Sequence, residues 1–125
     1  MRNLGKTQEI ISFLSDAKGL ISVGNFDFVP RRKNMIALLQ QNLTIIDAKN
    51  IIMGLGEGDY YKGPKRDINP AYPGDIWEFK TTVNRKPFYV KLKIVTVDGE
   101  ETLKCLGFHE DDFANSGGYT DEKTM

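Results

Sequence analysis

The chain has 125 residues with 17 basic and 17 acidic side chains, a size that suits a single domain with one hydrophobic core. No apolar run approaches the roughly 20 residues that a membrane-spanning helix needs, and the first residues lead into an amphipathic pattern rather than a signal peptide. A single cysteine excludes an internal disulfide, and the one histidine has no second soft ligand at a zinc spacing, which disfavours a metal site. We therefore expect a soluble cytoplasmic protein that uses no metal and no other cofactor.

Basic and acidic residues are separated along the chain. Residues 1–93 hold 15 Lys and Arg against 9 Asp and Glu, whereas residues 94–125 hold 2 against 8. A basic body fits a nucleic-acid-binding surface. Scattered charges followed by an acidic tail explain the same counts, so both interpretations stay open.

Three amphipathic helices are predicted in the N-terminal half, over about 7–18, 30–41 and 44–55. Thr7 is placed to cap the first helix, and Gly19 is placed to end it. Pro30 suits the first turn of the second helix, and Thr44 with Asp47 resembles a capping box that opens the third. Their apolar stripes should form much of the core.

A short strand is predicted over 26–29, and a run of three cations follows it. Arg31, Arg32 and Lys33 lie near the start of the second helix, where positive charge opposes the helix dipole. This misfit indicates an anion-binding role, although a solvated helix face is the simpler explanation. Further along, the segment 62–74 is so rich in Gly and Pro that a long loop is expected beside the sheet.

Three strands are predicted over about 75–80, 87–97 and 101–109. In the middle strand, apolar residues alternate with Tyr89, Lys91 and Lys93, so one sheet face is apolar and the other carries a phenol and two ammonium groups. Such a polar face suits a polyanion.

The apolar pattern also predicts how the strands pair. Keeping the aromatic residues on one face places Glu78 opposite Tyr89 across the first hairpin. In the second hairpin the same rule places His109 opposite Tyr89 and requires a three-residue loop around Asp98 and Gly99, because a two-residue turn would pair Lys91 with Leu106.

This polar face holds the groups that metal-independent RNA cleavage needs. In that reaction the RNA 2′-hydroxyl attacks the neighbouring phosphorus, so one group must accept a proton, another must protonate the leaving oxygen, and cations must stabilise the charge. His109 can exchange a proton near neutral pH, Glu78 can act as a base or an orienting partner, and Tyr89 can donate to the phosphate or stack on a base.

Each of these side chains also has a simpler interpretation. A lone histidine at a strand end is more often solvated or capping than catalytic, and alternating lysines on an exposed strand commonly serve solubility. Only their combination on one face supports a site.

In order and spacing, the residues from about 30 to 110 resemble the MqsR family of toxins, which have a RelE-like fold. The resemblance is carried by Gly54-Leu55, Asp59-Tyr60-Tyr61-Lys62, Ile76-Trp77, Tyr89-Val90-Lys91-Leu92-Lys93-Ile94 and Phe108-His109. It implies an mRNA interferase of a type II toxin–antitoxin system, held inactive by a cognate antitoxin. Lys62 and Tyr89 match active-site positions of that family, whereas Glu78 replaces a functional glutamine and His109 replaces a lysine.

Together, the pattern and the resemblance predict an α+β domain over residues 1–113, with helices packed on a small antiparallel meander, and a flexible acidic tail over 114–125. The predicted catalytic residues are Lys62, Glu78, Tyr89 and His109, and the predicted RNA-binding residues are Lys65, Arg66, Lys91 and Lys93. The expected partners are mRNA and an antitoxin. Other open possibilities are a non-catalytic module that binds RNA, the ribosome or a protein, and a toxin that inhibits a protein target such as gyrase.

Overall fold

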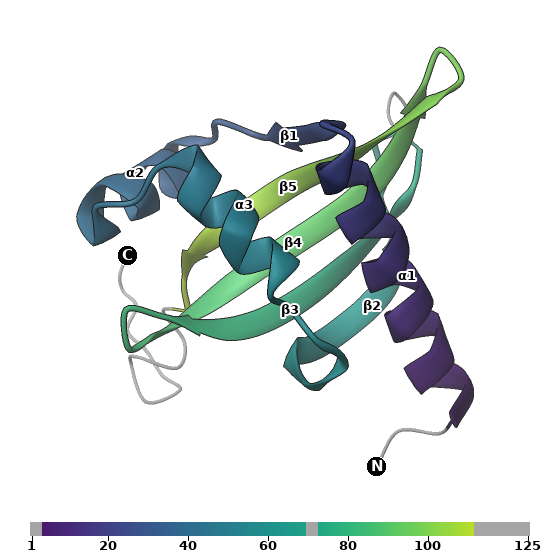
Figure 1. Cartoon of the computed structure of the whole chain (residues 1–125), viewed down its shortest axis with the longest axis horizontal. Coiled ribbons are helices and arrows are strands. Elements are labelled where there is room, and N and C mark those ends of the chain that lie inside the picture. The colour runs from purple at the N-terminus through teal and green to yellow at the C-terminus, as the bar shows by residue number, and fades with distance from the viewer. Residues whose placement is uncertain (1–3, 70–72, 112–125) are drawn as a thin grey trace.

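A computed structural model of the chain describes residues 4–69 and 73–111, which form helices packed on a small mixed sheet (Figure 1). The elements in chain order are α1 (Leu4–Ser22), β1 (Phe26–Phe28), α2 (Arg32–Gln41), α3 (Ile45–Met53), a 3₁₀ turn (Glu57–Asp59), β2 (Tyr60–Arg66), β3 (Asp75–Val83), β4 (Lys86–Val97) and β5 (Glu100–Glu110). The strand order is β1-β5-β4-β3-β2. The predicted α+β class is confirmed, but the sheet is not purely antiparallel, because β1 pairs in parallel with β5.

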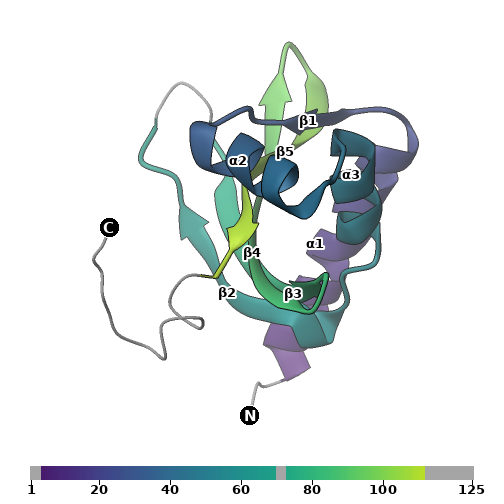
Figure 2. The same ribbon diagram turned by 90° about the vertical axis from the view of Figure 1, so that its left-hand side faces the viewer.

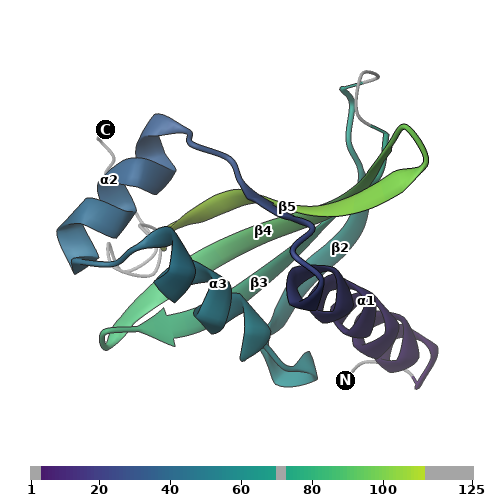
Figure 3. The ribbon, with the colours of Figure 1, turned by 45° about the horizontal axis from the view of Figure 1, so that its top comes forward.

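The helices bury their apolar stripes against one face of the sheet. Figures 1 and 3 show α1 and α3 crossing that face, while α2 lies near the end of β5. The most deeply buried large side chains of the strands are Phe79, Phe88, Val90, Leu92, Leu103 and Phe108. Phe13 of α1 stacks on Trp77 of β3 with ring centroids 4.8 Å apart. The opposite face of the sheet is therefore left for polar side chains.

The helix ends follow the predicted capping signals only in part. At α3, the Thr44 hydroxyl accepts from the Asp47 amide (3.1 Å) and the Asp47 carboxylate accepts from the Thr44 amide (2.8 Å), which confirms the capping box. The predicted start of α1 at Thr7 and its end at Gly19 are wrong, since the helix runs from Leu4 to Ser22. Ile21 is buried, and packing of this extra turn outweighs the ~1 kcal/mol cost of glycine within a helix.

The predicted loop over 62–74 is partly wrong, because its first residues belong to the edge strand β2. Two register shifts interrupt the pairing of β2 with β3, around Lys62. Such irregular edges accommodate proline, which cannot donate to a ladder. Gly63 is required there, since it has φ +120° and a Cβ would stand 2.7 Å from the Ile76 carbonyl oxygen. Residues 70–72 of the predicted loop and the predicted tail over 114–125 lie outside the described residues.

The first hairpin differs from the predicted register by two residues. Glu78 pairs with Lys91 and Tyr89 pairs with Lys80, because both strands extend to a two-residue turn at Asn84 and Arg85. Positive φ angles of 51° and 68° at these turn residues suit a hairpin turn of type I′. A shift of two residues preserves the face of every side chain, so Glu78 and Tyr89 still point to the polar side.

The second hairpin contains both of the registers that were considered as alternatives from the sequence, one in each half. Tyr89 pairs with His109, as predicted, but the expected three-residue loop is wrong, because Val97 pairs with Glu100 across a two-residue turn. The pairing shifts by one residue at Leu106, which is left as a bulge between the partners of Lys91 and Leu92. The bulge lets the tight turn and the apolar pattern coexist.

No helix among the described residues combines the length and the apolar character that crossing a membrane demands.

Candidate functional site

The four predicted catalytic side chains lie in a connected row across the polar face of the sheet. Lys62 comes from β2, Glu78 from β3, Tyr89 from β4 and His109 from β5. Lys62 Nζ is 4.0 Å from Glu78 Oε1, and the ring centroids of Tyr89 and His109 are 5.4 Å apart. Four consecutive strands of the meander thus each supply one group.

Tyr89 and Glu78 form the central hydrogen bond of this row. The Tyr89 hydroxyl donates to Glu78 Oε1, and Glu78 is only 5% exposed. Partial burial, and then the neighbouring Glu78 carboxylate, raise the pKa of Tyr89 well above its usual value, since both disfavour a phenolate. Tyr89 therefore keeps its proton at neutral pH and directs it towards Glu78.

His109 is oriented by the backbone of its own strand. Its Nδ1 lies 3.1 Å from the Glu110 carbonyl oxygen, which can only accept, so Nδ1 carries the proton of this hydrogen bond. The ring is tilted by 42° from the plane of Tyr89. In the neutral ring, this hydrogen bond makes Nε2 the acceptor nitrogen.

The bulge in β5 is held by a buried asparagine that the sequence analysis did not identify. Asn34 of α2 is 1% exposed, and its amide nitrogen donates to the carbonyls of Val29 and Leu106, each at 3.0 Å. Its side-chain oxygen accepts from the Phe108 amide at 3.0 Å. Asn34 thereby continues the edge pairing of β5 beyond β1 and fixes the segment that carries His109. The only sign of this role in the sequence was a polar residue within the apolar stripe of a predicted helix.

A small pocket opens beside Tyr89 and His109, with a volume of ≈ 90 Å³. Its cationic lining comes from Arg31, Lys33 and Lys91. Gly107 forms part of the wall, and a Cβ there would stand 3.2 Å from the Lys91 Cβ. The absence of a side chain at this position keeps the pocket open.

The four predicted RNA-binding residues have different environments. Lys91 lines the pocket, with Nζ 5.9 Å from the Tyr89 ring centroid. Lys65 and Arg66 are exposed on β2, where they pair with Ile76 and Asp75 at the start of β3, beyond Glu78.

The prediction that Lys93 presents an exposed cation is wrong. It is 2% exposed, and its Nζ lies 2.6 Å from Asp67 Oδ2. Residues that follow β2 cover this end of the polar face, and the Lys93 side chain also packs against Gly74. Sequence alternation gave the correct face but could not show this cover.

Tyr61 and Lys80 also border the site and were missed as site residues. The Lys80 ammonium lies 4.0 Å from the Tyr61 ring centroid and 3.0 Å from Asp111 Oδ2. Tyr61 is 46% exposed and suited to stacking on a base. Lys80 follows Glu78 at the strand spacing of two, so the alternation rule could have identified it.

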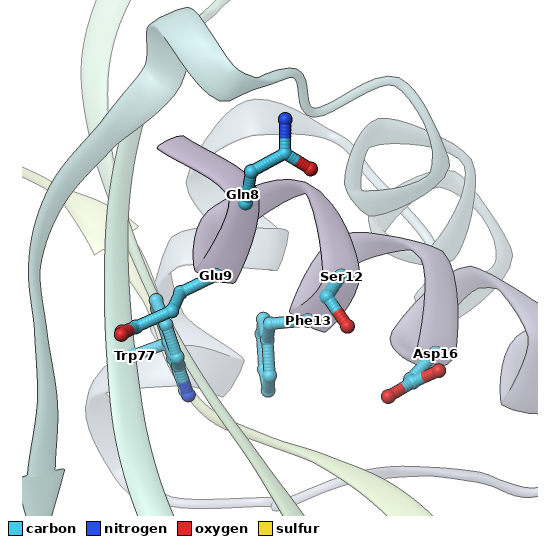
Figure 4. A pocket seen from close by; sticks show the side chains of 6 residues that line it. All are labelled: Gln8, Glu9, Ser12, Phe13, Asp16 and Trp77. Carbon is cyan, nitrogen blue, oxygen red and sulfur yellow. The ribbon is translucent and has the colours of Figure 1, made fainter. Parts of the chain in front are cut away.

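A larger pocket of ≈ 460 Å³ lies between α1 and Trp77 (Figure 4). Glu9, Ser12 and Asp16 line it along α1, next to the stacked Phe13 and Trp77. Its two carboxylates give it the wrong charge for RNA. Charge therefore favours the smaller pocket over this one as a place for an anion.

The remaining reactive side chain, Cys105, is buried in the core, and burial raises the pKa of its thiol to about 12. Within residues 4–69 and 73–111, no three His, Cys, Asp or Glu side chains gather in a way that could hold a metal ion. No protein family matches the chain, and no curated protein matches it significantly.

Proposed function

We propose that the protein is an endoribonuclease that cleaves mRNA by attack of the RNA 2′-hydroxyl and needs no metal ion. The observation that carries the proposal is the contact of Tyr89 with both a buried carboxylate and an imidazole, with cations on either side. A proton acceptor, a proton donor and positive charge are the three requirements of this reaction.

In the proposed mechanism, Tyr89 and Glu78 remove the proton of the attacking hydroxyl. The Tyr89 proton already points to Glu78, so the phenol oxygen can accept the 2′-hydroxyl proton as its own passes to the carboxylate. The raised pKa of Tyr89 excludes a standing phenolate and favours such a relay.

His109 then completes the cleavage. As an imidazolium it donates a proton from Nε2 to the departing 5′-oxygen, while Nδ1 stays bound to the Glu110 carbonyl. The bond from the 2′-oxygen to phosphorus forms as the bond to the 5′-oxygen breaks. The products are a 2′,3′-cyclic phosphate and a 5′-hydroxyl end.

Two exposed or half-buried lysines stabilise the negative charge of the reacting phosphate. Lys62 lies on the Glu78 side and Lys91 on the His109 side of Tyr89. Lys93 takes no part, because it is buried and paired with Asp67.

Incubation of RNA with the purified protein in EDTA tests this proposal. We expect wild type to cut RNA and leave cyclic phosphate ends, and His109→Ala to lower the rate by about 10²–10⁴-fold. Lys49→Ala, which removes a cation from α3 on the other face of the sheet, serves as the control and should cut normally. An RNA with a single 2′-deoxy nucleotide at the cleaved position should survive.

The biological role that fits this chemistry is that of a toxin in a type II toxin–antitoxin system. Expression in the cytoplasm should then arrest growth, and a cognate antitoxin should bind the protein and restore growth. Intact RNA in EDTA and in magnesium, from folded protein that still binds RNA in both wild type and His109→Ala, would instead identify a non-catalytic binding module.

A further inference from the structure

A run of three cations stands at the start of α2. Arg31, Arg32 and Lys33 are exposed, and positive charge at this end of a helix is unfavourable. The first turn of α2 contains no acidic residue, and Arg31 gives the helix no side-chain cap. Positive charge at this end of a helix is favoured where a negative group, such as a bound anion, lies nearby.

Two of the three cations line the small pocket beside the candidate site. Arg31 and Lys33 do so, whereas Arg32 does not. Figure 2 shows α2 next to the end of β5, and Asn34 joins the two elements through Leu106 and Phe108. The buried Asn34 thus holds the cationic start of α2 at a fixed position relative to His109.

The pocket lining comes from three elements and converges on one small volume. Lys91 of β4 and His109 of β5 face the two α2 cations across ≈ 90 Å³. Since one water in the liquid takes up about 30 Å³, the space holds only a few water molecules or one compact anion. Guanidinium and ammonium groups around such a volume suit a phosphate, with Arg31 able to form a bidentate contact.

The carboxylates of Asp67 and Glu78 lie near this pocket and have partners of their own. Asp67 interacts electrostatically with Arg31, but its carboxylate is already bound to the Lys93 ammonium and to the Asn69 amide. Glu78 lies on the other side of Tyr89 and accepts the phenol proton. Neither carboxylate lines the pocket.

We infer that Arg31, Lys33 and Lys91 form a phosphate-binding subsite next to His109. The inference rests on the proposed function, and it assigns the subsite to a backbone phosphate of the RNA. The RNA strand then leaves the active site over the start of α2. It does not run along β4 towards the buried Lys93. The α2 cations hold the substrate in register with Tyr89 and His109.

Titration with inorganic phosphate, followed by NMR, tests the subsite without any need for cleavage. His109 is the only histidine, so its imidazole C–H signals need no assignment. We expect phosphate to shift these signals to saturation in wild type. The variant with Arg31→Gln and Lys33→Gln should bind phosphate at least tenfold more weakly, whereas Arg32→Gln, which removes one charge of the same run outside the pocket, should change affinity less than twofold.

A single-stranded DNA oligonucleotide, which lacks the attacking hydroxyl, extends the test to a polymer. Loss of one phosphate contact lowers the slope of log affinity against log salt by about 0.7, so Arg31→Gln should show a shallower slope than Arg32→Gln, although each removes one charge. Preserved secondary structure by circular dichroism checks that both variants fold.

The possible results separate this subsite from the nuclease proposal. Phosphate that leaves the His109 signals unmoved, or an equal loss of affinity in Arg32→Gln, overturns the subsite. RNA cleavage that survives Arg31→Gln with Lys33→Gln at full rate also overturns it but leaves the nuclease intact. Phosphate binding with the expected loss, in a protein that cuts no RNA, supports the subsite and removes the nuclease.

Discussion

The two ends of β4 have the same alternating pattern but different surroundings. At one end, Tyr89 and Lys91 border a pocket and contact groups from neighbouring strands. At the other end, Lys93 is buried under residues that follow β2 and is paired with Asp67. Strand alternation therefore determines which face a side chain joins, whereas a distant connection determines whether that face meets solvent.

This contrast predicts the largest effects for RNA cleavage. Tyr89→Phe removes the proposed relay and should slow cleavage by about 10²–10⁴-fold, whereas Lys93→Met should leave the rate nearly unchanged. Single-turnover cleavage of a short RNA measures both. A large loss in Lys93→Met, with its fold intact, would show that the covered end also contacts the substrate.

The end of β4 with Tyr89 and Lys91 should also depend on Asn34, which holds the neighbouring bulge of β5. Asn34→Ala leaves the Leu106 carbonyl and the Phe108 amide without this partner, so we expect a loss of about 2–4 kcal/mol in the free energy of unfolding. Urea unfolding measures the loss, and Asn50→Ala on an exposed position of α3 is the control. Equal stability of the two variants would mean that the bulge holds itself in place.

At the covered end, the two partners of the ion pair should contribute unequally. Asp67→Asn leaves a buried ammonium without its carboxylate, whereas Lys93→Met leaves a half-buried carboxylate that water can reach. We therefore expect Asp67→Asn to have the lower urea midpoint. The opposite order would contradict the burial of Lys93.

The same ion pair predicts a dependence on acid. Hydrogen bonding to Lys93, followed by that to the Asn69 amide, lowers the pKa of Asp67 in the folded protein. This stabilisation is complete above the unfolded pKa of about 3.9 and is lost as pH falls through the lower folded value. Asp67→Asn should lack this part of the acid response.

The smallest expected effect is at alkaline pH, at the open end. Because the pKa of Tyr89 is raised, the folded protein retains a proton that the unfolded chain releases near pH 10, and stability should fall as pH rises above that value. Thermal melts of wild type and Tyr89→Phe between pH 9 and 11 measure this difference. A parallel decline in both would mean that other groups cause it.

Much of the fold could be predicted from periodicity. Three helices, the core face of the sheet and the pairing of Tyr89 with His109 all follow from apolar spacing, because burial of one face permits few registers. The predicted pairing of the first hairpin was wrong by two residues. Alternation determines which face each side chain occupies, but it does not determine where the strands end. Even so, the two-residue error kept Glu78 and Tyr89 on one face and in contact.

The remaining features depend on contacts between distant segments. The edge strand β2 contains Gly63 and Pro64, which locally indicate a loop, and it forms only because β3 offers partners. The burial of Lys93 requires Asp67, and the role of Asn34 requires a bulge 72 residues further along. No local pattern encodes such pairings. The burial of Lys93 and the hydrogen bonds of Asn34 to β5 were therefore not predicted.

The bulge at Leu106 divides β5 into two parts that follow different phases. The pairing from Val97 to Leu92 is one residue out of step with the pairing from Lys91 to Phe88. Homologous chains should therefore tolerate insertion or removal of residue pairs at the tip of this hairpin. The pairing that aligns the imidazole lies beyond the bulge and does not depend on the length of the tip. Deletion of the bulged residue alone should be rare among them, since it would turn either the imidazole or the core residues of this strand to the wrong face.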